Sequence, residues 1–157
     1  MKTTIVTLAA LLFFTLTPAS AHGQESHNAK AARLLNEAKV KFTKVDDGVW
    51  TVPFEGKKLK DFNVVIAADK TYLLMFVTVS NQKNFRSDPE LLKKLLAHND
   101  ELDRVKIGID ERGEVVVRID LSIRLVDRQE FADALNQSAA AADQVYGSII
   151  PYLNSTK

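Results

Sequence analysis

The sequence has no cysteine and only six glycines and four prolines in 157 residues. Without cysteine, a disulfide framework, a thiol nucleophile and a zinc–thiolate site are all excluded. The low glycine and proline content excludes a collagen-like or low-complexity chain. With 46% hydrophobic residues, a chain of this length can bury a core without covalent crosslinks. The composition therefore predicts one ordinary globular domain.

An excess of charge of one sign is also lacking. Lysine and arginine number 21 and aspartate and glutamate 20, so the formal net charge is +1. A nucleic-acid-binding domain carries a basic excess, which this chain does not have. One short basic cluster, residues 57–60, lies between Glu55 and Asp61 and contains none of the aromatic residues of a base-stacking platform. We interpret this cluster as a solvated turn and expect no nucleic-acid partner.

Motifs of known reactive sites are absent as well. The chain contains no Gly-x-Ser-x-Gly, no His-Glu-x-x-His and no phosphate-binding glycine loop. His98 could act as a base beside Asp100 or Glu101, but no nucleophile motif accompanies it. A histidine at the end of a helix is also explained by its favourable interaction with the helix dipole. We therefore expect no enzyme activity and no cofactor.

The first 21 residues have the organisation of a bacterial secretory signal peptide. Lys2 provides the positive start, residues 5–16 form the apolar run, Pro18 interrupts it, and residues 19–21 have the small-x-small cleavage pattern. The apolar run is shorter than the roughly 20 residues that span a bilayer, which disfavours the alternative of an uncleaved membrane anchor. We expect a periplasmic or secreted protein, with no stable membrane insertion after cleavage.

Cleavage after Ala21 would make His22 the new N-terminus. Its amine and imidazole can together chelate Cu(II), and His27 offers a further nitrogen. Residues 22–28 contain no apolar side chain and are predicted to be a flexible lead-in. Because nothing in such a segment arranges the nitrogens, we expect no metal site.

The periodicity of the remaining chain predicts one domain over residues 29–157. A first amphipathic helix starts at Ala29, and its apolar face runs from Ala31 to Phe42. A turn at residues 46–48 joins two short strands, at 43–45 and 49–52, and Pro53 indicates a position near a sheet edge. Residues 62–68 and 71–79 then form the clearest hairpin, joined at residues 69–70.

The second half of the chain repeats the pattern of helix and hairpin. Ser87 or Asp88 caps a helix whose apolar stripe is expected to be Leu91, Leu92, Leu95 and Leu96. Residues 105–109 and 115–123 form a second hairpin, and Asp127 begins the last helix with Glu130 at its capping-box position. Runs of strands without alternating crossover helices predict the α+β class, an antiparallel sheet with flanking helices.

Pairing about a two-residue loop at 69–70 sorts the first hairpin into two faces. One face carries Phe62, Val64, Ile66, Leu73, Met75, Val77 and Val79, and we expect the helices there. The other carries Val65, Tyr72, Leu74 and Phe76, among Asn63, Ala67 and Thr78. Burial of four large side chains would contribute about 6–12 kcal/mol, so the second face should not stay in water.

Two explanations for this second apolar face remain open. The second helix or the long loop of the same chain covers it, or it is a dimer interface or a surface for another protein. Trp50 would extend such a surface from a neighbouring strand, and Phe85 would add an anchor from the loop. The candidate partner-binding residues are therefore Val65, Tyr72, Leu74, Phe76, Trp50 and Phe85.

Several segments resemble a known family. They are Leu91 to Leu96 with Asn99, residues 105–110 (VKIGID), residues 113–121 (GEVVVRIDL), and the closing helix with residues 139–143 (AAAAD). They resemble the YbjN-type family of bacterial sensory transduction regulators, which is similar in fold to type III secretion chaperones. The similarity extends over residues 29–153 and includes no reactive residue.

The resemblance implies an α-β-β-β-α-β-β-α layout and a protein-binding, chaperone-like or regulatory role. Type III secretion chaperones are typically homodimers that hold an extended partner segment against apolar surface, and they act in the cytoplasm, whereas this chain has an export signal. We expect an exported, non-enzymatic module that binds a protein partner or a second copy of itself. The alternative is a periplasmic protein that binds a small molecule or lipid between its sheet and helices.

Overall fold

The computed structural model describes residues 25–81 and 88–154. The predicted signal peptide, His22 and Phe85 lie outside the described residues. The elements in chain order are α1 (His27–Glu37), β1 (Thr43–Asp46), β2 (Val49–Glu55), β3 (Asp61–Ala68), β4 (Tyr72–Ser80), α2 (Pro89–Glu101), β5 (Lys106–Ile109), β6 (Val115–Ser122), α3 (Arg128–Ile149) and the 3-10 turn η2 (Ile150–Tyr152).

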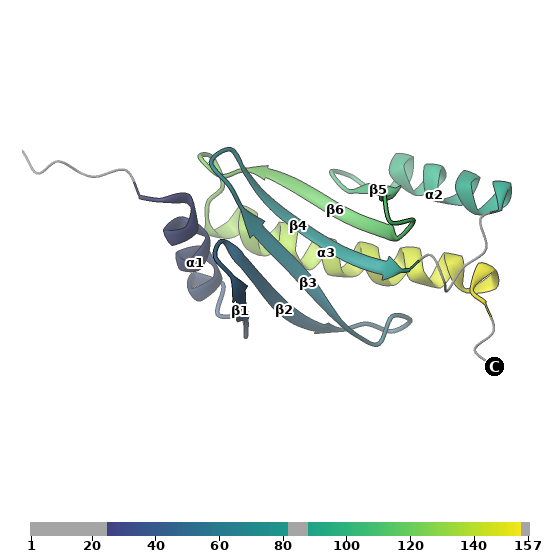
Figure 1. The fold of residues 1–157 in the computed structure, drawn as a ribbon, viewed down its shortest axis with the longest axis horizontal. Helices are drawn as coiled ribbons and strands as arrows, with labels where there is room; N and C mark the ends of the chain where they lie inside the picture. The colour runs from purple at the N-terminus through teal and green to yellow at the C-terminus, as the bar shows by residue number, and fades with distance from the viewer. Residues whose placement is uncertain (1–24, 82–87, 155–157) are drawn as a thin grey trace, which may run out of the picture.

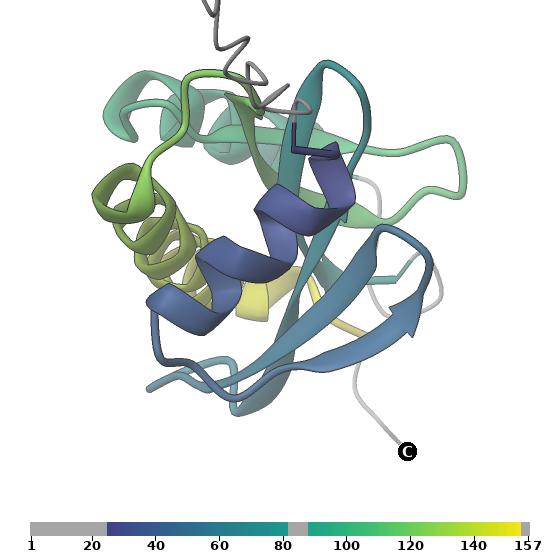
Figure 2. The same ribbon diagram turned by 90° about the vertical axis from the view of Figure 1, so that its left-hand side faces the viewer.

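The described strands form one six-stranded sheet in the order β1-β2-β3-β4-β6-β5, with every neighbouring pair antiparallel. The long helix α3 runs along one face of this sheet (Figure 1), and α1 lies on the same side (Figure 2). The predicted α+β class is thereby confirmed. Between α1 and α2 the structure has four strands where the resemblance implies three, because the short β1 is added at the sheet edge.

The register of β3 against β4 differs by two residues from the one that a two-residue loop would give. Ala68 pairs with Leu73, and the loop between the two strands consists of residues 69–71. The Asp69 carboxylate closes this loop, because it accepts the backbone N–H groups of Thr71 and Tyr72 at 2.6 and 2.7 Å. A shift of two residues leaves each side chain on its face, since the strand repeat is also two. The predicted faces are therefore right although the predicted loop is wrong.

The core lies between the sheet and the helices. From the hairpin it receives the buried side chains of Val64, Ile66, Leu73, Met75, Val77 and Val79. From α3 it receives Phe131 and Leu135 together with the small Ala134, Ala141 and Ala142. Small side chains allow α3 to pack close to the sheet. The face predicted to seat the helices does seat them.

The first helix begins at His27, before the predicted start at Ala29. Its N-cap is Ser26, whose hydroxyl accepts the Ala29 N–H at 3.2 Å. His27 and Asn28 are therefore helical and do not belong to a flexible lead-in. The helix ends at Glu37, and Lys39 adopts a positive φ of 56°, which is not helical geometry. The predicted continuation of the helical face to Phe42 is therefore wrong.

The predicted caps of the other two helices are confirmed. The Asp88 carboxylate accepts the Glu90 N–H at 2.8 Å, and Asp127 accepts the Glu130 N–H at 2.9 Å. Carboxylates at these positions also interact favourably with the helix dipole. Within residues 25–81 and 88–154, no helix is long and apolar enough to cross a membrane.

Candidate functional site

The second face of the sheet carries apolar side chains that no described helix covers. Val65, Leu74 and Phe76 are half-buried, and Tyr72 is 54% exposed. The helices α1 and α3 lie on the other side of the sheet (Figure 2), and α2 contacts β5 and α3. We call these four residues the open face. Coverage by the second helix is thus excluded for the described residues, whereas the long loop at residues 82–87 lies outside them.

The open face lies on the central strands and gives way to charge at one side. Val65 of β3 is paired with Phe76 of β4, and Phe76 with Arg118 of β6. Directly paired residues of an antiparallel sheet lie on the same face. Leu74 is likewise paired with Asp120, and Arg118 with Lys106 of β5. An apolar centre is therefore bordered by charged side chains on β6 and β5.

These bordering charges form a connected cluster. Asp120 accepts hydrogen bonds from Lys106 Nζ at 2.6 Å and from Arg118 Nη2 at 2.9 Å and Nε at 3.1 Å. Burial by itself raises the pKa of Asp120, but the hydrogen bonds from Arg118 and Lys106 outweigh it and hold the pKa below its usual range. The cluster therefore carries one net positive charge at neutral pH, next to the open face.

The open face is smaller than the sequence predicts. Three of its four side chains are half-buried, so the free energy still available from covering them is lower than full burial would give. Trp50 does not extend it. This residue pairs with Ile66 on the helix side, and its side chain is only 3% exposed in the core. Because strand side chains alternate, the two-residue repeat of β2 directs Trp50 to the core.

A second apolar surface was not predicted. The stripe of α2 divides: Leu91 and Leu95 are buried, but Leu92 and Leu96 are 42% and 69% exposed. With Ile109, these leucines flank a cavity of about 280 Å³ between α2 and β5. Its lining is Leu92, Leu95, Leu96, Asn99, Ile107, Gly108 and Ile109, which we call the α2–β5 groove. The sequence feature that indicates this surface is the four-leucine stripe itself. It is wide, and here α2 buries only two of the four leucines against the rest of the fold.

His98 lies in a constellation that resembles a hydrolytic triad. Its Nε2 is 2.7 Å from Ser148 Oγ, and its Nδ1 is 3.2 Å from Glu101 Oε2. The Ser148 hydroxyl, however, donates to the Val145 carbonyl at 2.8 Å. A serine nucleophile must donate its proton to its base, and here the Val145 carbonyl competes with His98 for the Ser148 proton. The bond joins α2 to α3, which is a structural role.

The segment that contains the two candidate metal-binding histidines, His22 and His27, is described only in part. His22 lies outside the described residues, and His27 is the first residue of α1. Within residues 25–81 and 88–154, no three histidine, aspartate or glutamate side chains are grouped in a way that could hold a metal ion.

Solved structures with the same fold come from two groups. The crystal structure of YbjN from E. coli matches with a TM-score of 0.59 and 18% identity, over 79% of this chain and 93% of that chain. The heterodimeric ExoU–SpcU complex from the type III secretion system of Pseudomonas aeruginosa matches with a TM-score of 0.52 and 19% identity, over 79% of this chain and 98% of that chain. The structure of the Yersinia pestis type III secretion chaperone SycH, in complex with a stable fragment of YscM2, matches with a TM-score of 0.54 and 14% identity, over 76% of this chain and 99% of that chain.

The sequence itself matches one family. No curated protein is similar enough in sequence to be matched to this chain. The family model of YbjN, described as "Putative bacterial sensory transduction regulator", matches residues 32–151. That match covers the described sheet and most of its helices and agrees with the structural similarity to E. coli YbjN. The chain belongs to the YbjN family.

Proposed function

We propose that this protein is a non-enzymatic module that binds a polypeptide through its open face. The observation that carries the proposal is the side-by-side position of Val65, Leu74 and Phe76 on the two central strands, with no described helix over them. Contiguous apolar surface of this kind is typical of protein-binding sites. Covering the exposed remainder of each side chain would contribute on the order of 1 kcal/mol.

The surroundings of the open face suit a polypeptide better than a small molecule. The face is an open sheet surface with a charged border, an arrangement of apolar centre and polar rim that is typical of protein interfaces. The space between sheet and helices, where the alternative places a ligand, is filled by fully buried side chains such as Phe131, Leu34 and Ile66. The border cluster of Arg118, Asp120 and Lys106 would orient the partner.

The related structures support the same class of function. Two of the similar folds were solved as complexes, ExoU with SpcU and SycH with a fragment of YscM2. We extend protein binding to this chain on the strength of the shared fold together with its own open face. From the export signal predicted in residues 1–21, we expect this activity in the periplasm or outside the cell.

We propose self-association as a second kind of protein binding, in which the partner is another copy of the chain. The α2–β5 groove offers an apolar surface separate from the open face, with Leu96 as its most exposed residue. In this arrangement two copies associate through their grooves and leave both open faces available. Sedimentation velocity of the wild type, Leu96→Asp and Phe76→Asp distinguishes the two surfaces. A dimer that is lost in Leu96→Asp but kept in Phe76→Asp assigns self-association to the groove.

Site-specific photo-crosslinking tests the main proposal. A photo-reactive phenylalanine analogue at position 76 should form adducts with a specific polypeptide in cells that export the protein. The same analogue at Gln129, an exposed position at the start of α3, serves as the control and should not. The polypeptide identified by mass spectrometry is then purified and titrated against the wild type and Leu74→Asp. Equal affinity for both proteins, or adducts at both positions, would contradict the proposal.

A stability control separates lost binding from lost folding. Met75 and Phe76 are adjacent in β4, but Met75 is fully buried in the core and Phe76 lies on the open face. An aspartate at position 75 should unfold the protein, whereas Phe76→Asp should melt as a folded protein at a modestly lower temperature. A Phe76→Asp variant that is unfolded would show that this face is part of the core.

A further inference from the structure

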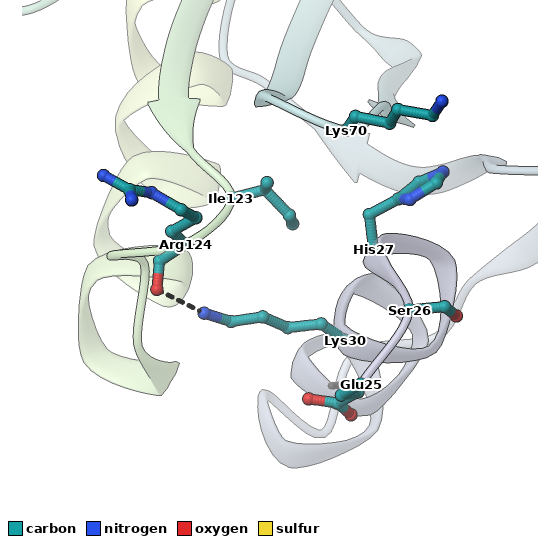
Figure 3. Close-up of a pocket in the computed structure, with 7 residues that line it drawn as sticks. All are labelled: Glu25, Ser26, His27, Lys30, Lys70, Ile123 and Arg124. Atoms are coloured by element: carbon teal, nitrogen blue, oxygen red, sulfur yellow. Dashed lines mark hydrogen bonds between the residues drawn. The ribbon is translucent and has the colours of Figure 1, made fainter. Parts of the chain in front are cut away.

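A second site lies at the end of the sheet, between the start of α1 and two loops. A cavity of about 560 Å³ opens there, lined by Glu25, Ser26, His27, Lys30, Lys70, Ile123 and Arg124. Figure 3 shows that these side chains surround the opening from separate parts of the chain. Four of the seven are basic residue types, although the whole chain has nearly balanced charge.

The basic side chains come from three segments that are distant in the sequence. His27 and Lys30 belong to the first turn of α1, Lys70 to the β3–β4 loop, and Arg124 to the segment between β6 and α3. Lys30 Nζ donates to the Arg124 carbonyl at 3.0 Å and so ties α1 to that segment (Figure 3). Neither Lys70 nor Arg124 forms an ion pair with any acidic side chain in the described part of the chain.

The two acidic side chains nearby are already engaged. Glu25 accepts Arg33 Nε at 3.1 Å and Nη2 at 3.0 Å, and Arg33 also pairs with Glu37 at 2.9 Å, so the charge of Glu25 is offset only in part. Asp69 uses its carboxylate to accept the backbone N–H groups that close the β3–β4 loop. The cavity therefore keeps a surplus of positive charge from Lys30, Lys70 and Arg124, even with both Glu25 and Asp69 counted.

From this arrangement we infer that the cavity binds an acidic segment of a partner polypeptide. This inference rests on the proposed function, and it assigns a chemical character to part of the partner. The cavity is much larger than one carboxylate or phosphate, and its basic groups are spread around the rim and do not converge on one point (Figure 3). Several negative groups carried on a flexible chain fit such a spread, and the lining contains no phenylalanine, tyrosine or tryptophan ring on which a nucleotide base could stack.

The position of the cavity links it to the open face. Lys70 lies in the loop that leads into β4 at Tyr72, which is the exposed residue at that end of the open face. The Ile123 N–H donates to the Thr71 carbonyl at 3.1 Å, so the Arg124 segment is held against the same loop. A chain that crosses the open face along β4 toward Tyr72 must then turn round the end of the sheet at Lys70 to reach the basic cavity, because α1 and Ile123 line that cavity from the helix side.

The test uses a short, fluorescein-labelled, glutamate-rich peptide without apolar residues, titrated by fluorescence anisotropy into the purified protein at low salt. The wild type should bind it, and Lys70→Glu/Arg124→Glu should weaken binding by about tenfold or more, since opposite charges at this rim are replaced by like charges. The matched control is Lys41→Glu/Lys60→Glu, which makes the same change of charge at two exposed lysines outside the cavity. It should bind within about twofold of the wild type.

Three results would overturn the inference. They are no binding by the wild type, equal weakening in both double variants, and binding of inorganic tripolyphosphate in the cavity without binding of the peptide. The last result would assign the cavity to a small anion. Each of them leaves crosslinking at position 76 unaffected, so failure here is distinguishable from failure of the proposed function. Conversely, Phe76→Asp should bind this peptide as the wild type does, because the peptide has nothing apolar to place on the open face.

Discussion

The side chain of Asn99 hydrogen-bonds to both backbone groups of Ile107, as the backbone of a neighbouring strand would. Its Oδ1 accepts the Ile107 N–H at 2.8 Å, and its Nδ2 donates to the Ile107 carbonyl at 2.9 Å. Ile107 lies in β5, the last strand of the described sheet, so its outward backbone groups have no strand partner. Unpaired edges are a common cause of aggregation. One side chain of α2 therefore caps the centre of this edge and fixes α2 beside it.

Replacement of Asn99 tests this cap. Asn99→Ala removes both hydrogen bonds and leaves the N–H and carbonyl of Ile107 without that partner. We expect a loss of about 1–3 kcal/mol of the free energy of unfolding, measured by urea denaturation. Asp100→Ala, an exposed neighbour in the same helix, should change it by less than about 0.5 kcal/mol. Equal losses in the two variants would show that helix propensity and not the cap is responsible.

Asp143 of α3 holds the β2–β3 loop and gives a pH-dependent contribution. Its Oδ1 accepts the Lys58 N–H at 2.6 Å and the Leu59 N–H at 2.8 Å. Burial raises the pKa of Asp143, but these backbone hydrogen bonds lower it more, so the net pKa lies below its usual value. A lowered pKa in the folded state stabilises the fold above the unfolded value of about 4, and this contribution is lost as the pH falls through the folded value.

The pH-silent variant Asp143→Asn isolates that contribution. At pH 7 the wild type should be the more stable protein, because hydrogen bonds to a charged acceptor are the stronger ones. The difference in the free energy of unfolding should shrink as the pH is lowered below about 4. Denaturation at a series of pH values measures it. A difference that stays constant from pH 7 to pH 3 would contradict the assignment.

Gly56 lies where the same loop meets Asp143. A Cβ at this position would collide with Asp143 Oδ1 and with the Leu59 carbonyl oxygen. Gly56→Ala should therefore destabilise the protein by about 1–3 kcal/mol. Gly108 is the matched control, because a Cβ there meets nothing within 4 Å. Gly108→Ala should be neutral or stabilising by up to about 1 kcal/mol, and thermal melting of both variants provides the comparison.

Ser138 is a buried serine of α3 whose hydroxyl has no hydrogen-bond partner within residues 25–81 and 88–154. Ser138→Ala removes a polar group without partner and should raise the free energy of unfolding by about 1 kcal/mol. Ser148 of the same helix is different, because its hydroxyl has hydrogen-bond partners in the Val145 carbonyl and His98 Nε2. Ser148→Ala should lower the free energy of unfolding by about as much. Destabilisation by both substitutions would mean that Ser138 does have a partner.

The amount of the fold that the sequence predicts differs between local and long-range features. The caps at Asp88 and Asp127 are correctly predicted, because a capping carboxylate and its N–H are two or three residues apart. The two faces of the β3–β4 hairpin are also correct, since the alternation survives an error of two residues in the pairing. The loop itself is not, because the two backbone bonds of Asp69 are a choice among several turns.

The candidate site is predicted in part. Val65, Leu74, Phe76 and Tyr72 do share an uncovered face, which depends only on alternation and on the number of helices available. Trp50 is wrongly included, because its face follows from the pairing of β2 with β3 and not from its hydrophobicity. The exposed half of the α2 stripe follows from where α2 docks, at β5 and α3.

By itself, the sequence determined the elements, their caps and the two faces of the central hairpin, because these depend on residues within a few positions of one another. The tertiary structure alone decided which apolar surfaces stay uncovered, because coverage depends on where helices dock. It also decided that Lys30, Lys70 and Arg124 surround one cavity. Sequence spacing carries no information on such a meeting, since strand order and loop path, set by burial of the whole core, bring distant segments together.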